Sequence, residues 1–316
     1  MLRARETVML REDKINRMLE APGFDDAAKL LLDCGYPDMA GMNMVQIENV
    51  LQKRRTDSYY EISNYEYALD ILNLFRIKYD YHNIKVLVKS MGANIDATYL
   101  LSDSGRIGAK ELNEAFITGQ RADLPRPVAS AMSSAVGILS RTGNPQLADI
   151  KIDKSYFGEL LSLAESLKND FIIGYVRLQI DSANLRTTVR SVRTGRSKDF
   201  LAGALIRGGS VDIEQIASSY DDDAIAPFSD DALGSAVRLG AEAMEGGAQT
   251  MFELACDNAI LHYVTNTVFI SFGPAPVVAY LAKLEWEITV VRMILTGKLT
   301  GISPDTIRER LRDCHV

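Results

Sequence analysis

The sequence Leu281-Ala-Lys-Leu-Glu-Trp-Glu-Ile-Thr-Val-Val-Arg-Met-Ile-Leu295 decides the fold class. Its aliphatic residues Leu281, Leu284, Ile288, Val291 and Leu295 advance by 3, 4, 3 and 4 positions. This spacing places them on one face of an α-helix, because a helix turns once every 3.6 residues. The segment therefore predicts a long helix with an apolar stripe.

The same periodicity recurs in the middle of the chain, where Leu178, Leu185 and Val189 share one helical face. Proline is absent between Pro37 and Pro125 and again between Pro145 and Pro227. Long proline-free runs favour helices, because an interior proline costs a helix about 3 kcal/mol. We therefore predict an all-α protein. Lys283 and Glu287 are four residues apart and are expected to pair on the side of their helix away from the apolar stripe.

Composition excludes several classes of protein. The 316 residues are 47% hydrophobic and 24% charged, which is ordinary for a chain with a substantial core and excludes a disordered chain. The net charge of −7 disfavours a nucleic-acid partner. Three widely spaced cysteines support neither a disulfide framework nor a zinc site.

One uncharged stretch of twenty-five residues, 258–282, has the length of a membrane span. It contains several polar residues and is interrupted by Gly273-Pro274, which would break a helix in mid-span. We interpret it as parts of two buried helices joined by a turn, with no membrane span.

A six-residue pattern occurs three times. Asp80-Tyr-His-Asn-Ile-Lys85 is followed 101 residues later by Asp181-Ser-Ala-Asn-Leu-Arg186, and 106 residues after that by Glu287-Ile-Thr-Val-Val-Arg292. Each has an acid first, an aliphatic residue fifth and a base sixth. The third copy has Val290 where the others have Asn83 and Asn184.

A glycine and two aliphatic residues five positions apart follow each copy, which is typical of a turn leading into a new helix. The glycines are Gly105, Gly209 and Gly301, and the aliphatic pairs are Ile107 and Leu112, Val211 and Ile216, and Ile302 and Ile307. We predict three helical repeats, over residues 1–102, 103–206 and 207–316.

The polar residues of these patterns have two interpretations. Asp80, Asn83, Asp181 and Asn184 are poor formers of helix interiors, so finding them there twice implies a role. They could form a polar network that fixes helix contacts between repeats, or they could line a shared pocket. Neither role is catalytic.

Arg186, Arg190 and Arg193 form a basic stripe on one helix. The stripe is either a docking face for an acidic partner or a solvated helix face. No phosphate-binding loop, dinucleotide fingerprint or nucleophile motif occurs, so we expect no catalytic residue, no cofactor and no bound metal. An acidic loop from Asp221 to Asp231 lacks the glycine and glutamate of a calcium-binding loop.

The order of several segments resembles the C subunit of vacuolar- and archaeal-type rotary ATPases, a family whose eukaryotic members are called d subunits. The resemblance is strongest over the last forty residues and extends over nearly the whole chain. The segments that carry it are Gly273–Glu287 continuing through Val291-Arg292 to Gly297–Gly301, Ile307–Leu311, Asp181–Arg186, the Gly208-Gly209 turn and, more loosely, Arg3–Arg5 with Met9-Leu10.

The resemblance implies three similar helical domains around a pseudo-three-fold axis, forming a funnel. It implies a non-catalytic rotor adaptor on the cytoplasmic face of a membrane, which joins the central stalk to the proteolipid ring and binds neither nucleotide nor ion. Members of the family usually begin slightly earlier, so Met1 is expected to fall within the first helix. Inward-facing polar and basic residues would line the stalk socket, with Asp80, Asn83, Asp181, Asn184, Arg186, Arg190, Glu287 and Arg292 as candidates.

Two alternatives from other classes stay open on the residues alone. One is a generic helical scaffold or regulatory adaptor that belongs to no rotary motor. The other is a helical enzyme with an unrecognised site.

Overall fold

The computed structural model describes residues 5–64, 68–221, 223–229, 232–266, 270 and 273–311. All of the regular secondary structure in these residues is helical, which confirms the all-α prediction. The uncharged stretch contributes to two helices, α13 and α14, as predicted. Nowhere in the described ranges is a helix both long enough and apolar enough to cross a membrane.

The helices form three packed groups, which we call bundles A, B and C. Bundle A joins the two ends of the chain, because α14 packs against α3, α4 and α15, and α15 packs against α2. Its elements are α14 (Ala275–Leu299), α15 (Pro304–Arg308), α2 (Glu12–Glu20), α3 (Phe24–Lys29), η1 (Leu32–Cys34) and α4 (Met44–Ile62).

The other two bundles are continuous in sequence. Bundle B consists of α5 (Ala68–Ala93), η2 (Thr98–Leu100), α6 (Ala109–Thr118), α7 (Arg126–Thr142) and α8 (Pro145–Ser166). Bundle C consists of α9 (Asp170–Arg193), α10 (Lys198–Ala204), α11 (Ile213–Ser218), η3 (Ser219–Asp221), η4 (Ala226–Phe228), α12 (Gly234–Met244) and α13 (Gln249–Thr265).

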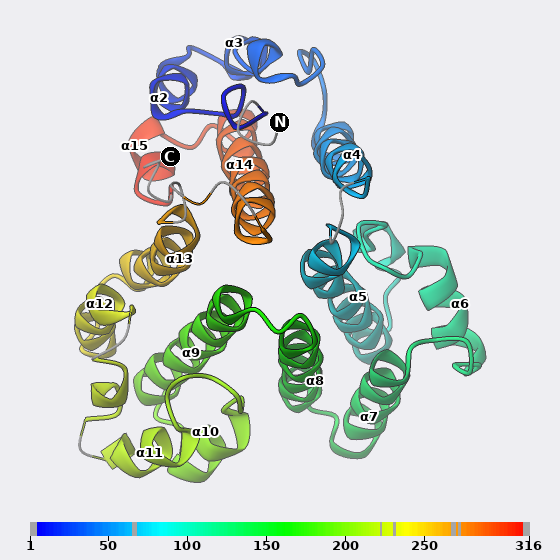
Figure 1. Cartoon of the computed structure of the whole chain (residues 1–316), viewed down its shortest axis with the longest axis vertical. Coiled ribbons are helices and arrows are strands. Elements are labelled where there is room, and N and C mark those ends of the chain that lie inside the picture. The colour runs from blue at the N-terminus through cyan, green and yellow to red at the C-terminus, as the bar shows by residue number, and fades with distance from the viewer. Residues whose placement is uncertain are drawn as a thin grey trace.

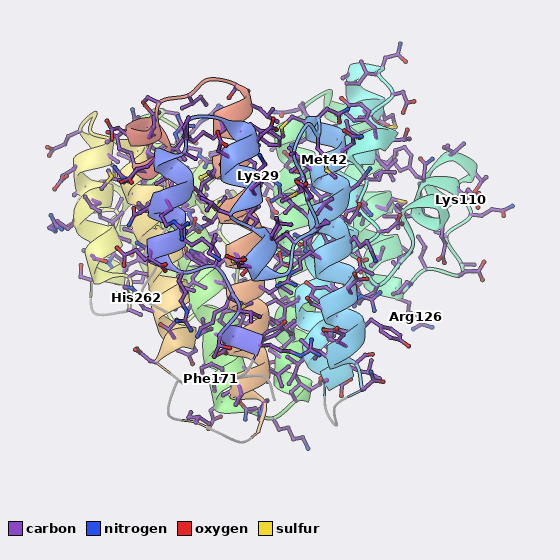
Figure 2. The ribbon with its side chains drawn as sticks, turned by 90° about the horizontal axis from the view of Figure 1, so that it is seen from above. Lys29, Met42, Lys110, Arg126, Phe171 and His262 are labelled. Carbon is purple, nitrogen blue, oxygen red and sulfur yellow. The ribbon has the colours of Figure 1, made fainter. Side chains whose placement is uncertain are left out.

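The three bundles follow one another around a ring, and the first and last described helices, α2 and α15, both lie in bundle A (Figure 1). Neighbouring bundles are joined where α4 packs on α5, α8 on α9 and α13 on α14. Seen at 90° to that view, the long helices run roughly parallel to one another (Figure 2). Bundles B, C and A begin at Ala68, Asp170 and Ala275, whereas the predicted repeats span residues 1–102, 103–206 and 207–316. The bundles are groups of packed helices and not domains, so the predicted domain boundaries stay a prediction.

The turn between α7 and α8 illustrates how local sequence sets these boundaries. Gly143 ends α7 with φ of 63°, a left-handed conformation that glycine adopts without steric cost. Asn144 then caps α8, its side-chain oxygen accepting a hydrogen bond from the Gln146 amide at 2.9 Å. Pro145 occupies the first turn, where its missing N–H costs nothing.

The apolar core consists of two clusters of buried residues, which do not coincide with the three bundles. One buried cluster runs through bundles A and B and extends into bundle C, where it includes the first half of α9 and the end of α13. A second, smaller cluster fills bundle C and includes Phe228, Leu233 and Phe252. Close packing of this kind makes the ring stiff, because protein interiors are as dense as organic crystals.

Helix α14 is covered on more sides than its sequence pattern predicts. It contacts α3, α4, α5, α9, α13 and α15. The side of α14 opposite the apolar stripe, where Lys283 and Glu287 were predicted to pair, is therefore buried as well: Lys283 is 5% exposed and Glu287 is fully buried. Lys283 Nζ lies 3.6 Å from a carboxylate oxygen of Glu6, and Glu287 contacts residues that precede α5.

Candidate functional site

The asparagines of the repeated pattern tether the loops that follow their helices. Asn83 on α5 donates to the Ser102 carbonyl at 2.8 Å and accepts from the Ser102 amide at 2.9 Å. Asn184 on α9 makes the same two bonds with Ile206, both 2.8 Å long. A side-chain amide offers both a donor and an acceptor, so it can replace a backbone partner. Each asparagine therefore fixes a loop within its own bundle.

The aspartates hold the next part of the same loops. Asp80 accepts hydrogen bonds from the amides of Arg106 and Ile107 at 2.9 and 3.2 Å. Asp181 accepts from the amides of Ser210 and Val211 at 2.8 and 3.2 Å. Both aspartates are fully buried, and these bonds compensate for the lost hydration of the carboxylates.

The glycines beside these aspartates allow the close approach. A Cβ at Gly105 would lie 2.3 Å from Asp80 Oδ1, and one at Gly209 would lie 2.0 Å from Asp181 Oδ1. Both distances are below any van der Waals contact, so only glycine fits. The predicted glycine signature thus has a structural cause in bundles B and C.

Glu287 performs the equivalent task in bundle A, but its partner is the N-terminal segment. One oxygen accepts from the Leu10 amide at 2.8 Å, and the other accepts from the Tyr36 hydroxyl at 2.8 Å. Arg54 adds an ion pair at 3.5 Å. The third copy of the signature is therefore not Gly301 with Ile302 and Ile307.

The third pair of aliphatic residues five positions apart is instead Leu10 and Ile15, because the Leu10 amide donates to Glu287 as the Ile107 and Val211 amides donate to Asp80 and Asp181. Leu10 lies two residues before the first residue of α2, as Ile107 and Val211 lie two residues before α6 and α11. Nothing lies within 4 Å of a Cβ placed on Gly301, in contrast to Gly105 and Gly209. The chain thus completes its third bundle with its own beginning.

The bases of the repeated pattern form equivalent ion pairs, each with a carboxylate of the last long helix in its bundle. Lys85 Nζ lies 2.5 Å from Asp153 on α8, and an Arg186 nitrogen lies 2.7 Å from Asp257 on α13. In bundle A the pair is Arg292 and Glu48, at 2.6 Å. Each pair holds two long helices of its bundle together.

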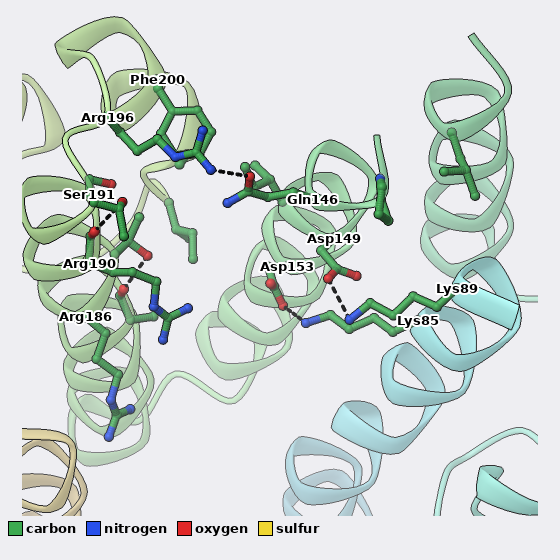
Figure 3. A pocket seen from close by; sticks show the side chains of 18 of the residues that line it. Lys85, Lys89, Gln146, Asp149, Asp153, Arg186, Arg190, Ser191, Arg196 and Phe200 are labelled. Carbon is green, nitrogen blue, oxygen red and sulfur yellow. Dashed lines mark hydrogen bonds and ion pairs between the residues drawn. The ribbon is translucent and has the colours of Figure 1, made fainter. Parts of the chain in front are cut away.

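A large cavity lies between bundles B and C. Its volume is about 910 Å³, and it is lined by residues of α5, α7, α8, α9 and α10. Figure 3 shows Lys85 and Lys89 reaching from α5 toward α8, with Arg186 and Arg190 on the facing side of α9. The predicted basic residues Arg186 and Arg190 therefore both line this cavity, whereas Asp80, Asn83, Asp181, Asn184, Glu287 and Arg292 do not.

Arg186 and Arg190 differ in how tightly they are held. Arg186 pairs with both Glu253 and Asp257 on α13, at 2.6 and 2.7 Å. Arg190 makes a longer contact of 3.5 Å with Glu253 and keeps 62% of its side chain exposed. Arg190 is thus available to a partner, whereas Arg186 mainly joins α9 to α13.

A smaller cavity of about 180 Å³ lies where all three bundles meet, lined by residues of α5, α8, α9, α13 and α14. Glu285 lies at its wall and binds across the gap between bundles A and B. It pairs with Arg55 at 2.7 Å and Lys78 at 2.8 Å, and it accepts from the hydroxyls of Tyr59 and Tyr79 at 2.7 and 2.8 Å.

Sequence reasoning missed Glu285, although a signal was present. Glu285 lies seven residues before Arg292, as Lys78 lies before Lys85 and Gln179 before Arg186. All three residues line the smaller cavity. If the alignment of the three six-residue patterns had been extended toward the N-terminus, it would have placed Lys78, Gln179 and Glu285 at equivalent positions.

Glu285 and Glu287 have opposite pKa shifts. Burial alone would raise the pKa of both carboxyls, because it disfavours the charged form. At Glu285 the charges of Lys78 and Arg55 and their hydrogen bonds outweigh burial and lower the pKa well below its usual range. At Glu287 burial prevails over the Leu10 amide and Arg54, and the pKa is raised.

The described part of the chain holds no group of three or more His, Cys, Asp or Glu side chains able to bind a metal ion. Residues 222, 230 and 231 of the predicted acidic loop lie outside the described residues.

We expect replacement of Glu287 by Leu to release the N-terminal segment selectively, because the Leu10 amide and Tyr36 hydroxyl lose their buried acceptor. Hydrogen exchange between residues 8 and 36 should accelerate at least about tenfold, while α7 and α8 keep their protection. Asp181→Leu is the matched control and should accelerate exchange only around residues 206–211. Equal acceleration throughout the ring would contradict the role assigned to Glu287.

Three helical bundles in a ring, with a charged site where they meet, define the class of the protein as an all-helical ring. Residues 1–310 match the family described as ATP synthase (C/AC39) subunit, and the chain belongs to this family. It is 22% identical to the C subunit of the V-type sodium ATPase of Enterococcus hirae, over 100% of this chain and 97% of the relative.

Two archaeal relatives are similar at the same level. The C subunit of the A-type ATP synthase of Thermococcus kodakarensis is 23% identical, over 98% of this chain and 87% of the relative. Its counterpart in the A-type ATP synthase of Methanocaldococcus jannaschii is 24% identical, over 98% of this chain and 84% of the relative. These findings confirm the family resemblance stated from the sequence.

Proposed function

We propose that this chain is a non-catalytic rotor adaptor of a V/A-type ATPase. In this role it seats the lower end of the central stalk on the membrane proteolipid ring and transmits torque for ATP-coupled proton or sodium transport. It lies peripherally at the cytoplasmic face of the membrane, within the complex. The observation that carries the proposal is the arrangement of three equivalent bundles around one charged site.

Closure of the ring supports a torque-bearing role. The N-terminal and C-terminal helices meet in bundle A, where Glu287 binds Leu10 and Arg292 binds Glu48. Adjacent bundles pack through long helices on every side, and Glu285 joins bundle A to bundle B. A ring without a loose seam resists twisting better than an open chain of bundles.

The state of the buried carboxylates supports a non-catalytic role. Asp80, Asp181 and Glu287 are fully buried and accept backbone amides, and Glu285 is surrounded by two cations and two tyrosine hydroxyls. Each carboxylate is thus engaged in holding helices and loops. A catalytic acid or base needs an oxygen that is free for a substrate, whereas both oxygens of Glu285, which lines the smaller cavity, are occupied by these partners.

The large cavity is the candidate contact for the stalk. Lys89 and Arg190 line it and keep 53% and 62% of their side chains exposed, so their charges can reach a partner. Arg186 is less suited to a test of docking, because reversal of its charge would also break the contact between α9 and α13.

We expect Lys89→Glu combined with Arg190→Glu to weaken binding of the central-stalk proteins by about tenfold or more at low salt. The loss should shrink as salt is added, because salt screens exposed charges. Titration of purified central stalk onto the tagged chain, repeated at several salt concentrations, measures the loss of affinity and its dependence on salt. Lys110→Glu combined with Arg238→Glu is the matched control, since these exposed cations lie on α6 and α12 outside the cavity. Equal loss in both variants would argue against docking at this cavity.

A further inference from the structure

Each bundle has one equivalent ion pair between two of its long helices: Lys85–Asp153, Arg186–Asp257 and Arg292–Glu48. The bundles differ one helical turn away from this pair, at the residue four positions after the base and the residue four positions before the acid. At these positions bundle B has Lys89 and Asp149, which are 2.7 Å apart. Bundle C has Arg190 with Glu253 at 3.5 Å. The corresponding residues of bundle A are Thr296 and Met44, which carry no charge.

The residues at the smaller cavity differ in the same way. The equivalent positions carry a cation in bundle B, an amide in bundle C and an anion in bundle A: Lys78, Gln179 and Glu285. Lys78 and Glu285 are paired at 2.8 Å, so these two charges largely cancel for a partner at a distance. The difference in charge between the three bundles that a partner meets is therefore set mainly one helical turn further along, at Lys89, Arg190 and Thr296.

The exposed charges of that turn lie on one side of the ring. Lys89 and Arg190 both line the cavity between bundles B and C, and no residue of bundle A lines it. The chain as a whole is acidic, with a net charge of −7. Lys89 is itself paired with Asp149, but the lining of this cavity still has an excess of cations: Lys85, Lys89, Arg186, Arg190 and Arg196 against Asp149 and Asp153. The cavity is therefore a local positive contrast to the rest of the chain. An acidic face of a partner is attracted to this side, whereas the hollow between bundles C and A has more acids than bases, Glu253 and Asp257 against Arg310.

Three alike bundles would accept a partner equally well in three orientations, each a third of a turn apart. We propose that Lys89 and Arg190 select one of them, so that an acidic face of the inserted stalk always lies against bundles B and C. This inference rests on the proposed function. It makes Lys89 and Arg190 specificity-determining residues for the rotational register of the stalk.

Site-specific cross-linking in the assembled complex tests the proposal. Ala93, Thr194 and Thr300 lie eight residues after the three bases, near the ends of α5, α9 and α14, and all three are exposed. Each is replaced by Cys in turn, in a chain that carries Cys314→Ser. Cys34 and Cys256 are buried and can stay, because burial raises the pKa of both thiols. A thiol-specific cross-linker then joins the chain to the stalk, and mass spectrometry identifies the stalk peptides.

In the otherwise unchanged chain, we expect each cysteine to capture a different face of the stalk, with one face at least about tenfold preferred over the others. In the variant Lys89→Thr with Arg190→Thr, which matches bundles B and C to Thr296 of bundle A, the preference should fall below about threefold. Lys110→Thr with Arg238→Thr is the control and should keep the preference.

Three outcomes would overturn the proposal. Equal capture of all stalk faces by the unchanged chain would show that no orientation is selected. An undiminished preference in Lys89→Thr with Arg190→Thr would assign the selection to other residues. Failure of all three cysteines to capture any stalk protein, in a complex shown to be intact, would contradict the proposed function itself.

Discussion

We expect replacement of Glu285 by Gln to lower the free energy of unfolding by about 3–5 kcal/mol, because it leaves a buried cation without its counter-charge. The Arg55 side chain is only 6% exposed and depends on Glu285 as its carboxylate partner, at 2.7 Å. The hydroxyls of Tyr59 and Tyr79 lose their charged acceptor as well. Urea denaturation followed by circular dichroism measures the change.

The loss should depend on pH in a defined direction. The pKa of Glu285 is lowered in the folded chain, so its contribution is fully present above the unfolded pKa of about 4.3. That contribution is lost as the pH falls through the folded pKa. The stability difference between wild type and Glu285→Gln should therefore stay constant from about pH 7 to pH 5 and narrow below about pH 4.

Glu114→Gln is the control for this prediction. Glu114 is exposed on α6 and faces Lys110 at 3.8 Å, so its replacement should change stability by less than about 0.5 kcal/mol. If both variants were equally stable, Glu285 would not join bundles A and B in the way described.

The second large effect is expected at Gly209, where Ala should destabilise the chain by about 3 kcal/mol. The new Cβ would lie 2.0 Å from Asp181 Oδ1, so the carboxylate must move away from the amides of Ser210 and Val211. Overpacking costs about 1–3 kcal/mol, and loss of buried acceptors adds to it. The shift of the thermal midpoint measures the sum.

Gly158→Ala should have the opposite sign. Gly158 lies inside α8, and nothing lies within 4 Å of a Cβ placed on it. Alanine should therefore stabilise the helix by about 0.5–1 kcal/mol, because glycine loses more backbone entropy on folding. Destabilisation by both substitutions would mean that the cost at Gly209 is not due to Asp181.

The fold class could be predicted from sequence because helical periodicity is a local property. The segment 281–295 gave the correct helix, and Gly273-Pro274 correctly separated it from the preceding one. The burial of Lys283 and Glu287 could not be predicted in this way. It depends on how many neighbours surround α14, and the spacing of residues within one helix does not contain that information.

The repeated pattern predicted which residues matter in bundles B and C, where each loop directly follows its helix in the chain. It failed for the third copy because Glu287 binds Leu10, 277 residues away. No local pattern joins the end of a chain to its beginning. Glu285 was missed for a related reason: its partners Arg55 and Lys78 belong to other helices, far away in the sequence.

Rotation of this chain within an active complex tests the central claim most directly. A bead attached through Lys110→Cys, which replaces a side chain 90% exposed on α6, would report the motion of the chain in an immobilised, ATP-hydrolysing complex. We predict that the bead turns continuously, at the same rate as a bead on the central stalk. A stationary bead on this chain, in complexes whose central stalk turns, would contradict the rotor-adaptor account.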